Sequence, residues 1–165
     1  MTIQPEESKV IQVLEKLGIE YTRCEHPPVF TVEQAEKHWA EIRGAHCKNL
    51  FLRNKKGNRH YLVILLASKQ ADLRGLNEKL GEDRLSFGSP ERLRKYLGLE
   101  PGSVSPFGLI NDRDKEVAVI IDEDLMRVDW VNFHPNVNTA TVGIRIADFE
   151  RFLAWTGHPA RYLRF

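Results

Sequence analysis

Apolar residues recur at helical spacing near the start of the chain. Val10, Leu14 and Leu17 fall on one face, acidic residues precede them, and Gly18 follows. An apolar stripe with acidic side chains in its first turn and a glycine at its end is typical of an amphipathic helix. Asp148 is predicted to cap the last helix of the chain. Capping residues and terminal glycines together predict further helices at about 31–41, 72–81, 89–98 and 148–157.

Alternating or β-branched apolar residues predict strands between these helices. The segments 47–53 and 61–66 flank a turn at 54–58, so we expect them to pair as a hairpin with a buried second strand. Helices and strands mix without a regular alternation, which favours an α+β fold with a mixed, largely antiparallel sheet and helices packed against it. Further strands are predicted at 19–24, 117–121, 130–133 and 139–146.

The composition is that of one globular domain spanning residues 1–165. The chain is 42% hydrophobic, and its 24 lysines and arginines against 23 aspartates and glutamates give a formal net charge of +1. Such a balance provides no global attraction to nucleic acid or to a membrane surface. We therefore expect no DNA partner and no membrane, and any RNA site must be local.

Cysteine usage and the N-terminal residues indicate the compartment. Cys24 and Cys47 stand in no metal-ligand or disulfide pattern. Residues 1–9 are polar and acidic, and nowhere do 18 apolar residues run together. We expect a reducing, cytoplasmic setting, with no targeting or membrane-spanning segment.

Several catalytic classes lack their defining residues. No GxSxG, GxxxxGK[ST], HExxH or GxGxxG motif occurs, which argues against a serine hydrolase, a P-loop enzyme, a zincin and a Rossmann dehydrogenase. The acidic run 122–124 has no calcium-loop spacing and is predicted to be a solvated turn. Cys47 is expected to face away from its neighbour Lys48, so a cysteine nucleophile is not predicted. We expect no metal ion and no other cofactor.

Two cations are candidate anion contacts. Lys48 shares a strand face with Leu50 and Leu52, so its ammonium group either extends to the rim of the sheet or holds an anion. Arg84 precedes a short strand at 85–87, where an arginine is normally a solvated charge. The residues alone leave both alternatives open.

Two polar segments are candidate site loops. Gly102 permits a positive φ and Pro106 fixes the exit of its loop, so the amides of Ser103, Val104 and Ser105 can converge on an oxygen atom. The same segment can equally be a plain loop. Farther along, His134 ends one strand and Asn138 precedes the next, where a structural histidine and an Asx turn are the simpler interpretations.

The order and separation of these segments carry a family resemblance. The stretch Cys47-Lys48-Asn49-Leu50-Phe51, the loop 102–106 and the segment 133–141 together resemble the YbaK/ProX family of aminoacyl-tRNA editing domains. Residues 152–158 look like the C-terminal helix of the freestanding prolyl-tRNA deacylases that clear alanine from proline tRNA. The resemblance runs from the first helix to the end of the chain.

The resemblance implies a sheet partly closed into a barrel and wrapped by helices, with a cleft for the 3′ end of a charged tRNA. It also implies hydrolysis of the aminoacyl ester, with Lys48 on the phosphate of the terminal adenosine and the amides of the loop 102–106 around the aminoacyl group. His134 and Asn138 would shape the pocket. Arg84 matches a basic residue used on the acceptor stem, and Lys69 is a further candidate tRNA contact. Candidates for the lining of the pocket are Val29, Phe30 and Leu50.

A mechanism without a side-chain nucleophile fits this set of residues. The neighbouring ribose 2′-hydroxyl can position the attacking water, so the protein need supply only phosphate anchoring and amide donors. One methylene is worth only about 1–3 kcal/mol in a pocket, so a proline-activating site admits alanine and a second, smaller site must remove it.

Two alternatives stay open at this stage. Within the family, the substrate can instead be cysteine on proline tRNA. In another class, the chain is a non-catalytic module that binds charged tRNA or a synthetase. Prolyl-tRNA synthetase is a candidate partner in either case.

Overall fold

The computed structural model describes residues 3–28, 30–40 and 42–165, apart from the side chain of Val32. The helices in this part of the chain are α1 (Pro5–Lys16), α2 (Val32–Trp39), α3 (Leu73–Leu80), α4 (Pro90–Leu97) and α5 (Ile146–Thr156), with 3-10 helices η1 (Pro106–Asn111) and η2 (Glu123–Arg127). The strands are β1 (Thr22–Glu25), β2 (Ala45–Asn54), β3 (His60–Leu66), β4 (Leu85–Phe87), β5 (Val117–Asp122), β6 (Trp130–Phe133), β7 (Ala140–Arg145) and β8 (Ala160–Leu163).

The strands form one mixed sheet in the order β1-β7-β6-β2-β3-β5-β8, and β4 pairs with β2 outside this path. The pairs β1·β7, β6·β7, β2·β3 and β2·β4 are antiparallel, and β2·β6, β3·β5 and β5·β8 are parallel. The predicted α+β fold with a mixed sheet is therefore confirmed.

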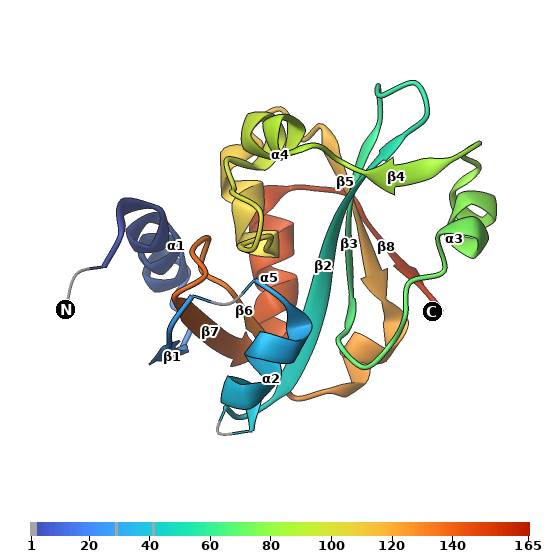
Figure 1. Cartoon of the computed structure of the whole chain (residues 1–165). Coiled ribbons are helices and arrows are strands. Elements are labelled where there is room, and N and C mark those ends of the chain that lie inside the picture. The colour runs from blue at the N-terminus through green and yellow to red at the C-terminus, as the bar shows by residue number, and fades with distance from the viewer. Residues whose placement is uncertain (1–2, 29, 41) are drawn as a thin grey trace.

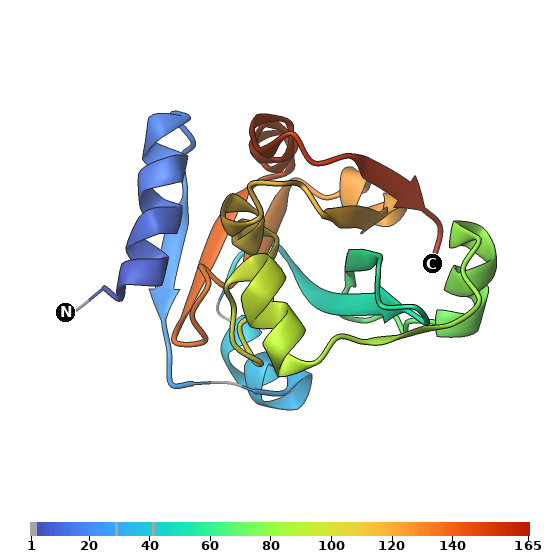
Figure 2. The same cartoon turned by 90° about the horizontal axis from the view of Figure 1, so that it is seen from above.

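The expected closure into a barrel is not supported. Among the described strands, β1 and β8 end the path and do not pair with each other. Figures 1 and 2 show β1 beside α1 at one end of the molecule and β8 at the other, so the two terminal strands cannot meet.

β2 joins the two halves of the sheet and leaves part of one edge open. Residues 47–53 pair with β3 along one edge. On the other edge, residues 45–46 pair with β6 and residues 52–54 pair with β4. Between them no described strand covers β2. Backbone hydrogen bonds of an antiparallel pair alternate along the strand, so the backbone groups of Cys47 and Asn49 face this gap.

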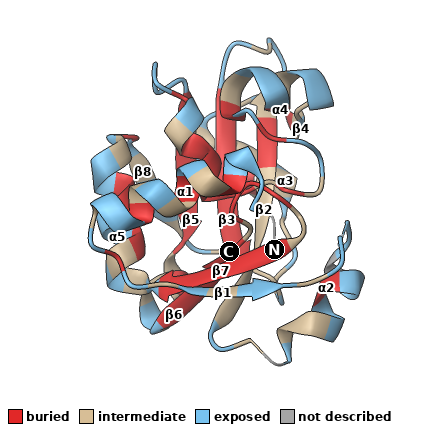
Figure 3. Ribbon diagram, turned by 90° about the vertical axis from the view of Figure 1, so that its left-hand side faces the viewer, coloured by how far each residue is buried: buried red, intermediate tan, exposed pale blue. Residues whose placement is uncertain are grey.

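The two faces of the sheet bury separate apolar clusters. The larger cluster contains Phe51 with α1, α4, η1 and α5, and the smaller one contains Leu52 with α3 and β4. Leu50 packs against the smaller cluster and Cys47 against the larger. The alternation predicted for 47–53 is therefore confirmed, and Lys48 shares the face of Leu50 and Leu52. Figure 3 shows the buried central strands and the largely exposed α2.

Local signals located most helix starts correctly. The side chains of Thr31, Asp72 and Ser89 each accept a backbone hydrogen bond at the start of α2, α3 and α4. The prediction that Asp148 caps the last helix is wrong, because β7 runs directly into α5 and the N-cap is Arg145. Asp148 lies within the first turn, where it pairs with Arg151 at 2.8 Å.

The acidic run 122–124 is not a solvated turn. The carboxylate of Asp122 is fully buried and accepts hydrogen bonds from the Lys69 ammonium at 2.8 Å and from the Leu66 amide at 3.2 Å. Lys69 also pairs with Asp124 at 2.6 Å. The sequence pattern missed this buried ion pair because Lys69 is distant along the chain. Within the described ranges, no helix combines the length and apolar character needed to cross a bilayer.

Candidate functional site

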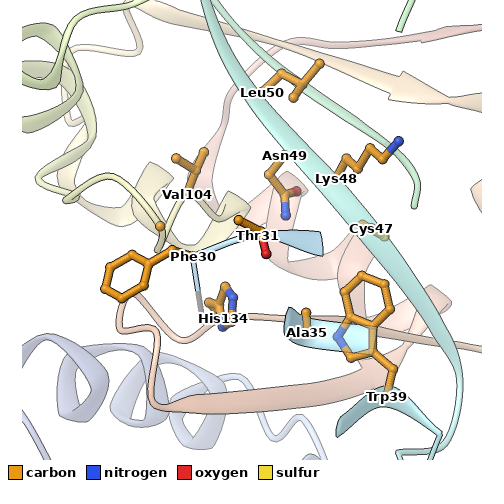
Figure 4. Close-up of a pocket in the computed structure, with 11 residues that line it drawn as sticks. Phe30, Thr31, Ala35, Trp39, Cys47, Lys48, Asn49, Leu50, Val104 and His134 are labelled. Carbon is orange, nitrogen blue, oxygen red and sulfur yellow. The ribbon is translucent and has the colours of Figure 1, made fainter. Parts of the chain in front are cut away.

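A cleft with a volume of about 280 Å³ opens at the uncovered edge of β2 (Figure 4). One wall is β2, and a second is α2 with its N-cap residue, where positions 31, 35 and 39 are four residues apart and so lie on one side of the helix. The loop 102–104 and the end of β6 complete the walls. The lining residues are Phe30, Thr31, Ala35, Trp39, Cys47, Lys48, Asn49, Leu50, Gly102, Val104 and His134.

Lys48 lines the cleft from the rim of the sheet. Its Nζ donates a 2.6 Å hydrogen bond to the main-chain oxygen of Lys69, and Figure 4 shows the side chain pointing away from His134. An ammonium group has three donors, so this bond leaves two for an anion. The position at the rim therefore permits both interpretations made from the sequence.

Asn49 is a site residue that the sequence pattern did not single out. Its side chain lies on the opposite face of β2 from Lys48 and points into the cleft (Figure 4). Its Oδ1 is buried and has no hydrogen-bond partner among the described residues. An unpaired buried acceptor costs about 1–3 kcal/mol of stability, so rotation of this amide toward a ligand in the cleft would relieve that cost.

The loop that begins at Gly102 lines the cleft with two residues whose backbone amides have no described acceptor. Gly102 has φ of +92°, and a Cβ added there would lie 2.9 Å from the Phe30 ring. Within the described residues, the amides of Gly102 and Val104 donate to no protein acceptor. Two such donors at a cleft wall can stabilise a developing oxyanion.

The rest of this loop is held internally. Ser103 is buried, and its amide and hydroxyl both donate to the oxygen of Glu100. Ser105 and Pro106 are also buried, and the Ser105 hydroxyl accepts from the Phe107 amide to begin η1. These three residues shape the loop from behind, and only positions 102 and 104 line the cleft.

His134 is a neutral imidazole at the floor of the cleft. Its Nδ1 lies 2.9 Å from the oxygen of Ala140, so Nδ1 carries the proton and Nε2 is an acceptor. Burial lowers the pKa of His134, and the nearby His26 lowers it further. Burial also raises the pKa of the Cys47 thiol, which keeps that side chain protonated and poorly nucleophilic.

Asn138 does not line the cleft. It lies behind Gly102, where an added Cβ would approach its Nδ2 to 3.7 Å, and it lines a neighbouring hollow that reaches Gln4 on the N-terminal side of α1. Between the two cavities stands Phe30, which lines both and is 67% exposed. Leu50 is half-buried in the cleft wall, and Val29 lies outside the described residues.

The two other candidate tRNA contacts lie outside the cleft. The Lys69 ammonium is already paired with Asp122 and Asp124. Arg84 is exposed just before β4, at the end of that strand away from the cleft. Both stay predictions as tRNA contacts.

The residues missed by the sequence pattern come mostly from α2. Ala35 and Trp39 gave only an ordinary helical pattern in the sequence, and it is the structure that places them in the lining of the cleft. The Trp39 ring also stacks on His46, with 4.5 Å between the ring centroids. Together the lining of the cleft includes a cation, a neutral imidazole, an amide side chain and two residues whose backbone amides have no described acceptor. This set can bind a phosphate and a polarised carbonyl without a side-chain nucleophile.

Comparison with known proteins identifies relatives over most of the chain. Residues 26–152 match the family model described as aminoacyl-tRNA editing domain. The chain is 45% identical to the prolyl-tRNA editing protein ProX of Acetoanaerobium sticklandii, covering 90% of this chain and 91% of that protein. It is 35% identical to the prolyl-tRNA synthetase associated domain-containing protein 1 of Mus musculus, covering 93% of each.

Matches of lower sequence identity are also to proteins named for aminoacyl-tRNA editing or deacylation. The multifunctional Ser/Thr-tRNA deacylase ProXp-y of Escherichia coli is 27% identical, covering 87% of this chain and 85% of that protein. The crystal structure of a proposed trans-editing enzyme for prolyl tRNA synthetase superposes with a TM-score of 0.74 at 23% identity, covering 99% of both chains, and so shares the fold.

Proposed function

This chain belongs to the aminoacyl-tRNA editing domain family, and on that premise we propose that its substrate is proline tRNA mischarged with alanine. The chain is an aminoacyl-tRNA deacylase that acts on mischarged tRNA. The choice of proline tRNA is supported by the names of the relatives with the higher identities.

The reaction is hydrolysis of an ester. Water adds to the carbonyl carbon, the bond from that carbon to the ribose oxygen breaks, and the products are the free amino acid and the uncharged tRNA. The single observation that carries the proposed mechanism is the pair of unpaired amides of Gly102 and Val104 opposite β2 in one cleft. These amides would bind the oxyanion that develops on the carbonyl.

The other side chains have positioning roles in this proposal. Lys48 would bind the phosphate of the terminal adenosine with its two remaining donors. His134 would accept a hydrogen bond at Nε2 from the ribose or from the attacking water. The ribose 2′-hydroxyl would orient that water, because the protonated Cys47 thiol offers no nucleophile.

Size selection would come from the face of α2. Ala35 and Trp39 place a small and a large side chain along one wall of the cleft, where they would decide between a methyl group and a pyrrolidine ring. The mouse relative is named for association with prolyl-tRNA synthetase, which supports that synthetase as a partner that hands over the charged tRNA.

The test is deacylation of proline tRNA charged with alanine, cysteine or proline. We expect release of alanine, with proline spared. Release of cysteine alone would identify cysteine-charged proline tRNA as the substrate and leave the proposed mechanism unchanged. Binding of charged tRNA without release of any amino acid would favour the non-catalytic module and overturn the proposal.

A further inference from the structure

The cleft continues along β2 into a second hollow. This neighbouring hollow has a volume of about 310 Å³ and shares Asn49, Leu50, Gly102 and Val104 with the cleft. Its remaining walls come from β4 and α4. The further lining residues are Phe51, Phe87, Gly88, Pro90, Leu93 and Pro101. The two hollows together form one groove, which we call the β2 groove, that runs from Trp39 to Phe87.

Phe87 lies unusually far out of the core at the end of this groove. It belongs to β4 and is 63% exposed, whereas Leu85, two residues earlier and on the same strand face, is 4% exposed. Gly88 follows, and its amide donates to the oxygen of Phe51 at 2.9 Å. A Cβ at Gly88 would lie 2.5 Å from the Phe51 ring, so the close approach that ends β4 beside the groove requires glycine.

A second exposed aromatic stands along the same groove. Phe30, 67% exposed, lines the cleft beside Gly102. Phe30 and Phe87 are the two most exposed large apolar side chains among the described residues, and both line the β2 groove. Exposed aromatic rings along one groove are the usual platform for unstacked bases.

The charge of the groove lining suits a nucleic-acid strand. None of the residues that line the two hollows is acidic, and Lys48 supplies a cation. A groove with aromatic rings and no carboxylate in its lining can accept the negatively charged phosphodiester backbone of a single strand without repulsion.

We propose that Phe87 is a stacking platform for an unpaired nucleotide that precedes the terminal adenosine of the charged tRNA. This inference rests on the proposed function, since it extends the substrate from the aminoacyl adenosine in the cleft to the single strand behind it. Phe87 acts as a positioning residue: it touches no reacting atom and holds the strand so that the ester reaches Gly102 and Val104.

The first experiment compares two substrates of different length. Phe87→Ala and the control Tyr162→Ala, which removes an aromatic ring that is 43% exposed on β8, are assayed on alanine-charged proline tRNA and on the alanyl ester of adenosine. Loss of one base stack should lower kcat/KM on the tRNA roughly 5- to 150-fold for Phe87→Ala, through KM, and leave hydrolysis of the small ester unchanged. Tyr162→Ala should match the wild type on both substrates.

Substitutions at the same position separate stacking from apolar contact. Phe87→Trp should restore activity on the tRNA, and Phe87→Leu should behave like Phe87→Ala because leucine has no ring face. Equal loss on both substrates, or no loss on the tRNA, would overturn the inference. If the wild type hydrolyses neither substrate, the proposed function itself fails, which is a distinct result.

A competition measurement covers the case of slow turnover of the small ester. The trinucleotide CCA should inhibit the wild type roughly 5- to 150-fold more strongly than adenosine 5′-monophosphate does, and Phe87→Ala should abolish that preference, since both inhibitors carry the phosphate proposed for Lys48. An unchanged preference would overturn the inference. A change of mass in solution from a dimer to a monomer on Phe87→Ala would also overturn it, because the ring would then cover a second copy of the chain.

Discussion

Lys48 donates a 2.6 Å hydrogen bond to the main-chain oxygen of Lys69, whose own ammonium group is held by Asp122. The cation proposed for the substrate phosphate is thus tied to a segment that a buried carboxylate fixes. Asp122 also accepts the amide of Leu66, so the end of β3 and the chain that follows it share one anchor. The position of Lys48 at the rim of the cleft depends on that anchor.

Lys48→Met should lower kcat/KM on charged tRNA roughly 10- to 150-fold, because a hydrogen bond to a charged group is worth about 1.5–3 kcal/mol. Steady-state kinetics at several salt concentrations measures the effect, and the variant should also show a weaker salt dependence. Lys56→Met, which removes an exposed lysine from the turn after β2, is the control. Equal losses in both variants would contradict a specific phosphate contact.

Asp122→Asn should destabilise the fold by about 3 kcal/mol, since it leaves the half-buried Lys69 ammonium without its buried partner. Urea denaturation measures the free energy of unfolding. At urea concentrations too low to unfold the variant, KM for charged tRNA should rise, because the main-chain oxygen of Lys69 that accepts from Lys48 shifts. Asp124→Asn removes the more exposed partner of Lys69 and should have a much smaller effect on stability.

Gly102→Ala should abolish most activity with little loss of fold. The residue has φ of +92°, which costs about 1–2 kcal/mol for alanine, and the new Cβ would collide with the Phe30 ring at the cleft wall. Gly81→Ala is the matched control, because Gly81 has φ of +68° with no atom within 4 Å of an added Cβ. Deacylation and thermal unfolding are measured for both. Equal deacylation activity in Gly102→Ala and Gly81→Ala would contradict the proposed role of the Gly102 loop in catalysis.

Asn49→Leu should raise stability and lower activity together. The substitution removes a buried oxygen that has no described partner, so the free energy of unfolding should rise by up to about 1–3 kcal/mol, while hydrolysis of the mischarged tRNA falls. Chemical denaturation and deacylation assays on the same preparation measure both quantities. A loss of stability would mean that the Oδ1 atom has a structural partner, and the proposed ligand role would be wrong.

Stability should fall as the pH drops below about 6.5. Burial lowers the pKa of His60 to about 4, with a contribution from Arg92, and burial also lowers the pKa values of His46 and His134. The unfolded chain binds protons at these sites first, so the loss begins near the unfolded value of 6.5 and for His60 is complete near pH 4. His60 contributes no more than roughly 3 kcal/mol of this loss.

Denaturation curves between pH 4 and 8 measure this dependence, and His60→Gln should flatten it. An unchanged profile in that variant would contradict the role of His60. Arg92 Nη1 lies 2.9 Å from Nε2 of His60. The variant keeps Arg92, so it differs from the wild type only in the titrating side chain.

The sequence by itself determined features that depend on neighbours along the chain. Thr31, Asp72 and Ser89 begin helices because each side chain reaches a backbone amide three residues on. The alternation of β2 fixed the face of Lys48, because successive side chains of a strand point to opposite sides. The order of the segments around Lys48, Gly102 and His134 was enough to identify the family, which the comparisons then confirmed.

Only the tertiary structure decided which residues share the cleft. The gap at the edge of β2 exists because β6 and β4 cover its two ends, and both pairings join segments far apart in sequence. That gap exposes Asn49 to the cleft and opens the groove to Phe87, whereas Asn138 falls behind Gly102. Asp122 became a buried anchor for the same reason, since its partner Lys69 lies in the segment that follows β3. Short-range sterics and hydrogen bonding fix the local elements, and long-range strand pairing decides where the elements meet and what they leave open.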